Sequence, residues 1–178
     1  VYVLISASGK VLEQTAAAGG VPVVRGVTLE SAAPGTMLDP AGDAHLDAML
    51  TVLQTLDAAD MLDGLDFLNL RELTDIRIGY GGRFDIRVGT VEQLAYRLRF
   101  AQTVITERLS PSDVGYLYWD NRSRLHFVPD TAENVAKSGG ETVQPPADDT
   151  PVDLTGGTDE TPSGADSGAE AEDEETDG

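Results

Sequence analysis

The 178-residue sequence contains no cysteine, and its 12 lysine and arginine residues are outnumbered by 31 aspartate and glutamate residues. Without cysteine, disulfides, cysteine-ligated zinc and thiol catalysis are excluded. The net charge of −19 argues against nucleic acid as a partner, because there is no excess of cations to displace counterions from phosphates. No apolar run approaches the ~18 residues that span a bilayer. The chain begins at Val1, without an initiator methionine and inside a strand-like segment, so we expect it to be a fragment of a longer protein.

Charge and aromatic content divide the chain into two parts. Residues 1–130 hold 11 basic and 17 acidic residues, a net charge of −6, and every aromatic residue of the chain. Residues 131–178 hold one lysine and 14 acidic residues, a net charge of −13, with few sizeable apolar residues. Burial in such a segment is too small to offset the entropy lost on ordering. The sequence therefore predicts a globular domain over residues 1–130 and a disordered acidic tail over residues 131–178.

Hydrophobic periodicity predicts seven strands and two helices in the globular part. Pro22 has no N–H for a sheet ladder, so its strand should start there or lie at an edge. Hairpin strands with two packed helices predict an α+β fold around a mostly antiparallel sheet. The expected strands are 1–6, 11–14, 21–26, 71–79, 83–88, 115–119 and 124–128, and the expected helices begin near Asp43 and Thr90.

Local signals suggest how these elements begin and what they expose. Asp43 suits the start of the first helix, which should end near residues 57–60. Thr90 followed by Gln93 fits a capping box for the second helix, which Pro111 should stop. In the central hairpin around Gly81-Gly82, one face is expected to be buried. The other face carries Arg77, Arg83, Asp85 and Arg87. We expect these residues to form exposed ion pairs that contribute little to stability.

The residue types that carry chemistry do not form a recognisable catalytic set. His45 and His126 lie far apart in sequence, and a zinc site needs a second imidazole or positioned carboxylates. The glycine-rich stretch 79–82 precedes a strand rather than a helix, so it does not suit a phosphate. Four aspartates lack the spacing of a calcium loop and are expected to form a solvated acidic helix end: Asp57, Asp60, Asp63 and Asp66. We expect no enzymatic activity, no metal and no cofactor.

The last predicted hairpin concentrates aromatic and apolar residues near the end of the globular part, and two interpretations of it stay open. If its second strand lies at a sheet edge, its outer backbone groups accept a partner strand and outward aromatics anchor that partner. Alternatively, these side chains pack on the second helix. The residues are Tyr116, Tyr118, Trp119, Leu125 and Phe127.

Several short segments, taken in order, resemble the extracytoplasmic β-domain of the bacterial division protein family FtsQ/DivIB, especially its Gram-positive forms. The resemblance covers residues 1–130, and Tyr118 stands where the family often has an aspartate. The similar segments are Tyr2-Val3-Leu4-Ile5, Gly9-Lys10-Val11-Leu12, Val21-Pro22-Val23-Val24-Arg25-Gly26, the central hairpin 76–88, residues 88–98 and the closing hairpin 115–129.

The resemblance implies a non-enzymatic divisome scaffold in bacterial cell division and septum formation. Members of the family bind FtsL and DivIC/FtsB-type partners outside the membrane, and their last β-strand accepts a partner strand. Carried over to this sequence, the expected partner-binding residues are Arg124, Leu125, His126, Phe127 and Val128, with Tyr118 and Trp119 from the preceding strand.

In the parent protein, the resemblance implies a cytoplasmic tail, one membrane helix and a POTRA domain before this region, which then lies on the extracytoplasmic side at the division septum. The alternative function is an extracytoplasmic cell-wall carbohydrate-binding or hydrolytic domain that uses carboxylates near residues 60–66. A wide polar cleft lined by aromatics favours that alternative. The acidic tail is expected to be a solvated spacer, so that deleting residues 131–178 leaves stability and partner affinity nearly unchanged.

Overall fold

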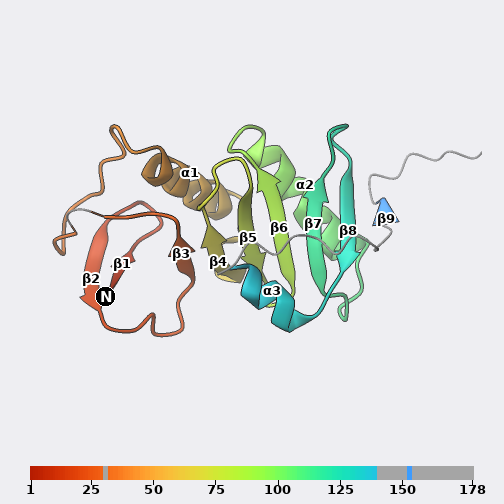
Figure 1. Cartoon of the computed structure of the whole chain (residues 1–178), viewed down its shortest axis with the longest axis horizontal. Coiled ribbons are helices and arrows are strands. Elements are labelled where there is room, and N and C mark those ends of the chain that lie inside the picture. The colour runs from red at the N-terminus through yellow and green to blue at the C-terminus, as the bar shows by residue number, and fades with distance from the viewer. Residues whose placement is uncertain (30–31, 140–151, 154–178) are drawn as a thin grey trace, which may run out of the picture.

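The computed structural model describes residues 1–29, 32–139 and 152–153, and in these ranges the fold is α+β, as predicted (Figure 1). A two-stranded sheet lies beside a larger sheet of seven strands. The elements in chain order are β1 (Tyr2–Ile5), β2 (Val11–Thr15), β3 (Val23–Arg25), α1 (Ala44–Ala58), the 3-10 turn η1 (Leu62–Gly64), β4 (Leu65–Asn69), β5 (Ile76–Tyr80), β6 (Phe84–Gly89), α2 (Leu94–Glu107), β7 (Gly115–Trp119), β8 (Leu125–Pro129), α3 (Ala132–Ser138) and β9 (Val152–Asp153).

The larger sheet is mixed but mostly antiparallel, with strand order β3-β4-β5-β6-β7-β8-β9. Its parallel pairs are β3–β4 and β6–β7. Each is connected through a helix, α1 in the first case and α2 in the second, because parallel neighbours need a crossover too long for a tight turn. Pro22 directly precedes β3, which is an edge strand of this sheet, in agreement with the expectation for that proline.

The main hydrophobic core lies between one face of the large sheet and the helices α1 and α2. The face is made by alternate strand residues, which point to the same side of a sheet. Because successive strands contribute residues in register, the core is continuous across the sheet. Its fully buried strand residues include Leu68, Ile76, Ile78, Phe84, Ile86, Leu117 and Leu125.

The first helix begins as predicted and the second does not. The Asp43 carboxylate accepts hydrogen bonds from the N–H groups of His45 and Leu46 at 2.9 and 3.0 Å, which satisfies donors that the helix leaves open. The predicted capping box at Thr90 is wrong, because α2 begins at Leu94 after a tight turn. The N-cap is Gln93, with φ +60° and no side-chain cap; Arg97 instead ties the helix back to the Val88 carbonyl.

The predicted order lacks the strand β4, which lies between β3 and β5 in the observed sheet. Apolar residues Leu65, Phe67 and Leu68 of this strand are buried, so the strand is covered on both faces and shows no clean alternation. Asp66 belongs to β4, where its carboxylate accepts a hydrogen bond from the Gly82 N–H at 2.5 Å. It is therefore not part of an acidic helix end, and it helps hold the β5–β6 turn.

A third helix, α3, follows the residue at which the globular part was expected to end. Its N-cap Thr131 accepts from the Asn134 N–H at 3.2 Å, and Asp130 accepts from the Asn134 side chain at 2.7 Å. Val135 is buried, and the helix lies across the sheet face opposite α1 and α2 (Figure 1). The expectation of two helices and of disorder from residue 131 is thus wrong for residues 131–139. Most of the remaining acidic tail, 140–151 and 154–178, lies outside the described residues.

Candidate functional site

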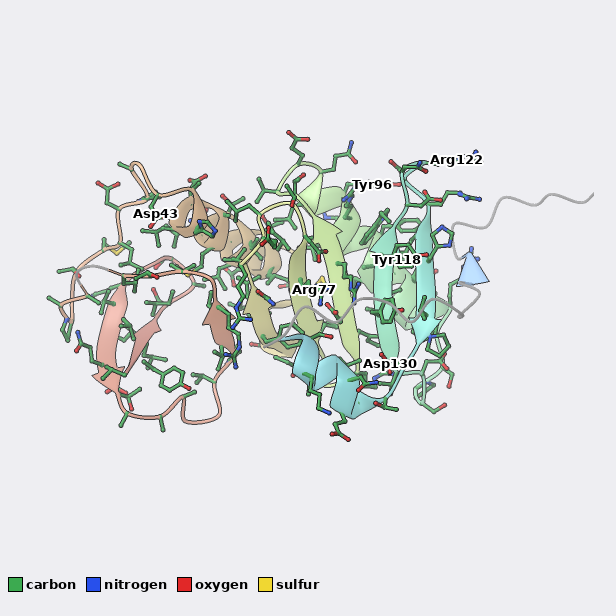
Figure 2. All side chains as sticks on the ribbon, in the orientation of Figure 1. Asp43, Arg77, Tyr96, Tyr118, Arg122 and Asp130 are labelled. Atoms are coloured by element: carbon green, nitrogen blue, oxygen red, sulfur yellow. The ribbon has the colours of Figure 1, made fainter. Side chains whose placement is uncertain are left out.

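Asp120 organises the turn that joins β7 to β8. Its Oδ1 accepts hydrogen bonds from the N–H groups of Arg122 and Arg124 at 2.8 and 2.9 Å. Its Oδ2 lies 2.9 Å from Arg124 Nη2 and 3.1 Å from His126 Nε2. These bonds, led by the Arg124 N–H, hold the pKa of Asp120 well below its ordinary value. The turn, with Arg122 near its tip in Figure 2, thereby fixes the start of β8.

Three of the predicted partner-binding side chains face the hydrophobic core. Leu125 is fully buried and Phe127 is nearly so. The Phe127 ring meets Phe84 edge to face at 6.3 Å, a favourable arrangement for two aromatic rings. Trp119 packs half-buried against the same core, with the Arg97 guanidinium 5.4 Å from its ring centre. These side chains stabilise the hairpin from the inside, which corresponds to the second of the two interpretations left open by the sequence.

The remaining predicted side chains lie on the opposite face or in the turn. Tyr118 stacks on His126 with ring centres 5.2 Å apart, and Val128 is buried on the same side. Arg124 is exposed, with its side chain held by Asp120. Tyr118 and Arg124 are therefore the members of the predicted set that offer side-chain surface away from the core, whereas Leu125 and Phe127 offer their backbone.

The orientation of the backbone groups of β8 follows from its pairing with β7. The Asp120 N–H donates to the Arg124 carbonyl at 3.0 Å and the Asp130 N–H donates to the Val114 carbonyl at 2.9 Å. In an antiparallel ladder, residues alternate between pointing their N–H and C=O groups at one neighbour and at the other. Arg124, His126 and Val128 thus direct these groups at β7. Leu125 and Phe127 direct theirs outward, together with the carbonyl of Pro129.

This outer edge of β8 is the strand edge that the sequence predicted as the interface. In the described part of the chain it pairs with β9 at two positions, in antiparallel register: His126 opposite Asp153 and Phe127 opposite Val152. No register position of β9 lies opposite Leu125 or Val128. The edge therefore carries an added strand over part of its length and keeps an outward N–H at Leu125 beyond that strand.

On the face that α3 covers, the structure has a buried ion cluster where the sequence predicted exposed ion pairs. The cluster consists of Asp75, Arg77, Asp85 and Arg87. Arg77 Nε lies 3.0 Å from Asp75 and Nη1 lies 3.9 Å from Asp85, while Arg87 Nε lies 3.3 Å from Asp85. The Asp85 side chain is fully buried and those of both arginines are at least nine-tenths buried. The expectation of a solvated charged face is wrong, because α3 was not predicted.

Burial raises the pKa of Asp85 above its ordinary value, against the opposing effect of Arg87 and then Arg77. Its Oδ1 has no hydrogen-bond partner within the described ranges. Ser138, at the end of α3, lowers the pKa of Asp85 through a side-chain hydrogen bond, as the arginines do through their charge. The Ser138 carbonyl accepts a hydrogen bond from the Asn69 side chain at 3.3 Å. α3 is thus seated by polar contacts on both β4 and β6. Arg77 marks this face in Figure 2.

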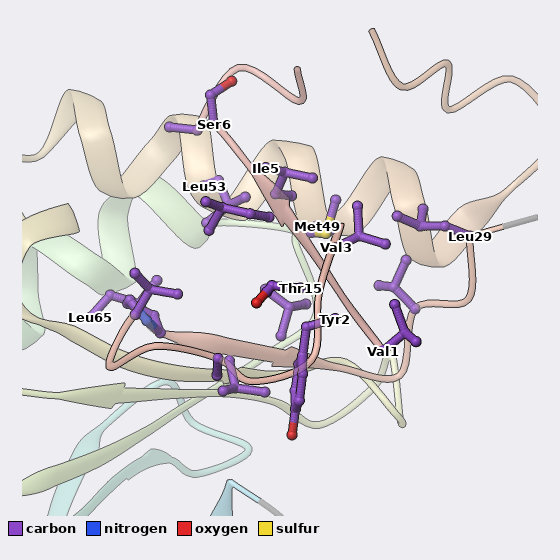
Figure 3. A pocket seen from close by; sticks show the side chains of 18 of the residues that line it. Val1, Tyr2, Val3, Ile5, Ser6, Thr15, Leu29, Met49, Leu53 and Leu65 are labelled. Carbon is purple, nitrogen blue, oxygen red and sulfur yellow. The ribbon is translucent and has the colours of Figure 1, made fainter. Parts of the chain in front are cut away.

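A cavity of about 580 Å³ lies at the other end of the molecule, between the β1–β2 hairpin, the chain around β3 and helix α1 (Figure 3). Its wall is mostly aliphatic, with Met49 and Leu53 from α1 and Leu65 from β4. The carboxylates Asp60, Asp63 and Asp66 are not part of that wall. Among the described residues, the one aromatic residue of the wall is Tyr2, and the polar side chains are hydroxyls such as those of Ser6 and Thr15.

Neither histidine belongs to a metal-binding group among the described residues. His126 is buried between Tyr118 and Asp120, and His45 lies in the first turn of α1. Within the described ranges there is also no helix of the length and apolarity that a bilayer crossing requires.

Comparison with known proteins finds no match, whether to protein-family models, to curated proteins or to solved structures.

Proposed function

We propose that this chain is the extracytoplasmic β-domain of an FtsQ/DivIB-type scaffold of the bacterial divisome. In this function it binds FtsL and DivIC/FtsB-type partners at the division septum and has no catalytic role. The parent protein is a single-pass protein of the cell membrane, with this region outside. The proposal rests on the resemblance of residues 1–130 and on the character of the β8 edge.

The observation that carries the proposal is that the outer edge of β8 accepts an added antiparallel strand. β9 comes from beyond the last helix and pairs with His126 and Phe127, so this edge is suitable for strand addition. In such complexes the backbone ladder supplies affinity, while side chains at alternate positions supply selectivity. The side chains suited to selectivity are Tyr118 and Arg124, because Leu125 and Phe127 are committed to the core.

A matched pair of variants at Phe127 tests strand addition. Phe127→Ala removes a core side chain but keeps the outward N–H, whereas Phe127→Pro removes both. The comparison therefore isolates the backbone donor from the loss of packing, which by itself costs about 3–5 kcal/mol. Affinity for the extracytoplasmic parts of DivIC/FtsB-type and FtsL partners is measured by calorimetry, at a temperature where far-ultraviolet circular dichroism shows both variants folded.

We expect Phe127→Pro to bind at least about tenfold more weakly than Phe127→Ala, since it loses one ladder bond and its ring obstructs the approaching strand. Equal affinity of the two variants, each made in a chain whose β9 carries Val152→Pro and Asp153→Pro so that β9 does not pair, rules out pairing at Phe127. If neither variant folds, binding of the unaltered chain is followed instead by the hydrogen exchange of the Leu125 amide, which strand addition protects. Failure of the unaltered chain to bind any of these partners refutes the proposed function itself.

A further inference from the structure

The partner-binding edge proposed above already holds a strand of the same chain. β9 (Val152–Asp153) pairs antiparallel with β8, although twelve residues separate it from Gly139, the last described residue after α3. In this register Val152 stands opposite Phe127, whose N–H and C=O point away from β7. The chain therefore uses one of its two outward-pointing N–H positions on β8 for its own tail.

The resident strand is short in comparison with the edge. β9 has two residues and β8 has five. Pro151 precedes Val152 in the sequence and has no N–H to extend the ladder on that side. A strand that pairs along the whole of Leu125–Pro129 makes contacts that β9 does not make, at Leu125 above all.

We infer that β9 is a built-in competitor, which occupies the β8 edge in the isolated chain and is displaced by a longer strand of the partner. This inference rests on the proposed function for the identity of the displacing strand, but not for the occupancy of the edge. The partner that fits is an extended segment of at least five residues that runs antiparallel to β8 and pairs with Leu125 as well as with Phe127.

Covalent connection makes so short a strand an effective competitor. A segment of the same chain pairs intramolecularly, so pairing that is too weak to hold two separate molecules together still competes for the edge. The apparent affinity of a partner then falls by the fraction of molecules whose edge is open. One or two ladder bonds change an equilibrium constant by only a small factor each. We therefore expect β9 to reduce the apparent affinity of the partner by about threefold to tenfold.

The experiment compares two double variants of the full chain that change the same number of residues and remove the same charge. Val152→Pro with Asp153→Pro deletes both N–H donors of β9. Thr158→Pro with Asp159→Pro introduces two prolines and removes one aspartate outside β9. The first measurement is amide hydrogen exchange by NMR at Phe127 in the absence of any partner, with the central sheet amides of Ile78 and Ile86 as internal references.

We expect exchange at Phe127 to become about threefold to tenfold faster in the β9 variant, while the control variant and the two reference amides stay unchanged. The second measurement is affinity for the extracytoplasmic part of a DivIC/FtsB-type partner, which should tighten by the same factor in the β9 variant alone. Agreement of the two factors supports displacement, because both report the same open fraction.

Unchanged exchange at Phe127 overturns the inference whatever the partner does, since the edge is then open in solution. Faster exchange with unchanged partner affinity overturns it as well, because β9 and the partner do not compete. Faster exchange combined with no binding by any of the chains supports occupancy of the edge by β9 and refutes the proposed function, so the two failures are distinguishable.

Discussion

Shortening the chain from its C-terminus tests whether α3 is part of the folded domain. Three forms are compared: the full chain, a form ending at Gly139 and a form ending at Asp130. The sequence alone predicts equal stability for all three, because residues 131–178 were expected to be a solvated spacer. The structure predicts a loss of stability between Gly139 and Asp130, because α3 lies in that interval and covers the buried ion cluster.

The size of the loss follows from what α3 buries. Val135 is 4% exposed, and burying a valine side chain is worth about 1.5–3 kcal/mol. The bond from the Asn69 side chain to the Ser138 carbonyl adds about 0.5–1.5 kcal/mol. In so short a helix, the entropy cost of ordering the backbone nearly cancels the stabilisation by helical hydrogen bonds. When α3 is removed, water hydrates Arg77 and Asp85, and this reduces the loss of stability. We expect a net loss of about 2 kcal/mol.

Urea unfolding monitored by the emission of Trp119, the one tryptophan of the chain, measures this difference directly. A loss of about 2 kcal/mol corresponds to a decrease in Tm of about 6–10 °C for a domain of this size. The form ending at Gly139 should match the full chain within about 1 kcal/mol, since it lacks only the two-residue pairing of β9 and the undescribed tail. Equal stability of the Asp130 and Gly139 forms refutes the assignment of α3 to the domain.

Three further substitutions test the interior and the β7–β8 turn. Asp85→Asn removes the buried carboxylate that both arginines contact, while Asp75 stays beside Arg77, and should lower the free energy of unfolding in urea by about 3–5 kcal/mol; a change below about 1 kcal/mol contradicts a charged cluster. Gly79→Ala places a Cβ 2.2 Å from the Phe67 ring and should cost about 1–3 kcal/mol by the same assay, so a neutral result contradicts that packing. The pKa of Asp120 is depressed, so its stabilisation is present above about pH 4 and is lost as pH falls. Melting curves of Asp120→Asn should therefore lie below those of the unaltered chain at pH 7, and the difference in Tm should shrink as the pH falls from about 4 toward about 2; a difference that stays constant over this range contradicts this role.

Local signals in the sequence predicted much of the fold because they act over a few residues. The Asp43 cap and the Gly81-Gly82 turn were predicted correctly, since each depends on its immediate neighbours. The capping box at Thr90 failed although its pattern is present. Gly89 has φ +75° and ends β6, and the following turn places the helix start at Leu94, where Arg97 reaches the Val88 carbonyl. Tertiary contacts thus overrode a local signal.

The missed elements share a physical cause, which is that their burial depends on distant parts of the chain. β4 is covered on both faces, so it lacks the alternation that identifies a half-buried strand. α3 has one well-buried large apolar side chain, Val135, within a strongly acidic segment. Its local signal was Thr131 followed by Asn134, a helix N-cap that the composition of the tail outweighed in the prediction.

For the candidate interface, the structure tests the side-chain orientation, while partner binding stays a prediction. The outer edge of β8 takes an added strand from the same chain. Of the two open interpretations of the last hairpin, packing in the core holds for three side chains, and acceptance of a partner strand stays a proposal. Side chains of Leu125 and Phe127 pack in the core, while their backbone groups point outward.

Hydrogen exchange of β8 in the unaltered chain, with and without the extracytoplasmic part of a DivIC/FtsB-type partner, tests the central proposal most directly. The proposal predicts that saturating partner slows exchange at Leu125 at least tenfold, since no described residue of β9 stands opposite this outward N–H. His126 and Val128, which point at β7, should change little. Tight binding that leaves Leu125 unprotected, or that protects only residues away from β8, contradicts strand addition at this edge.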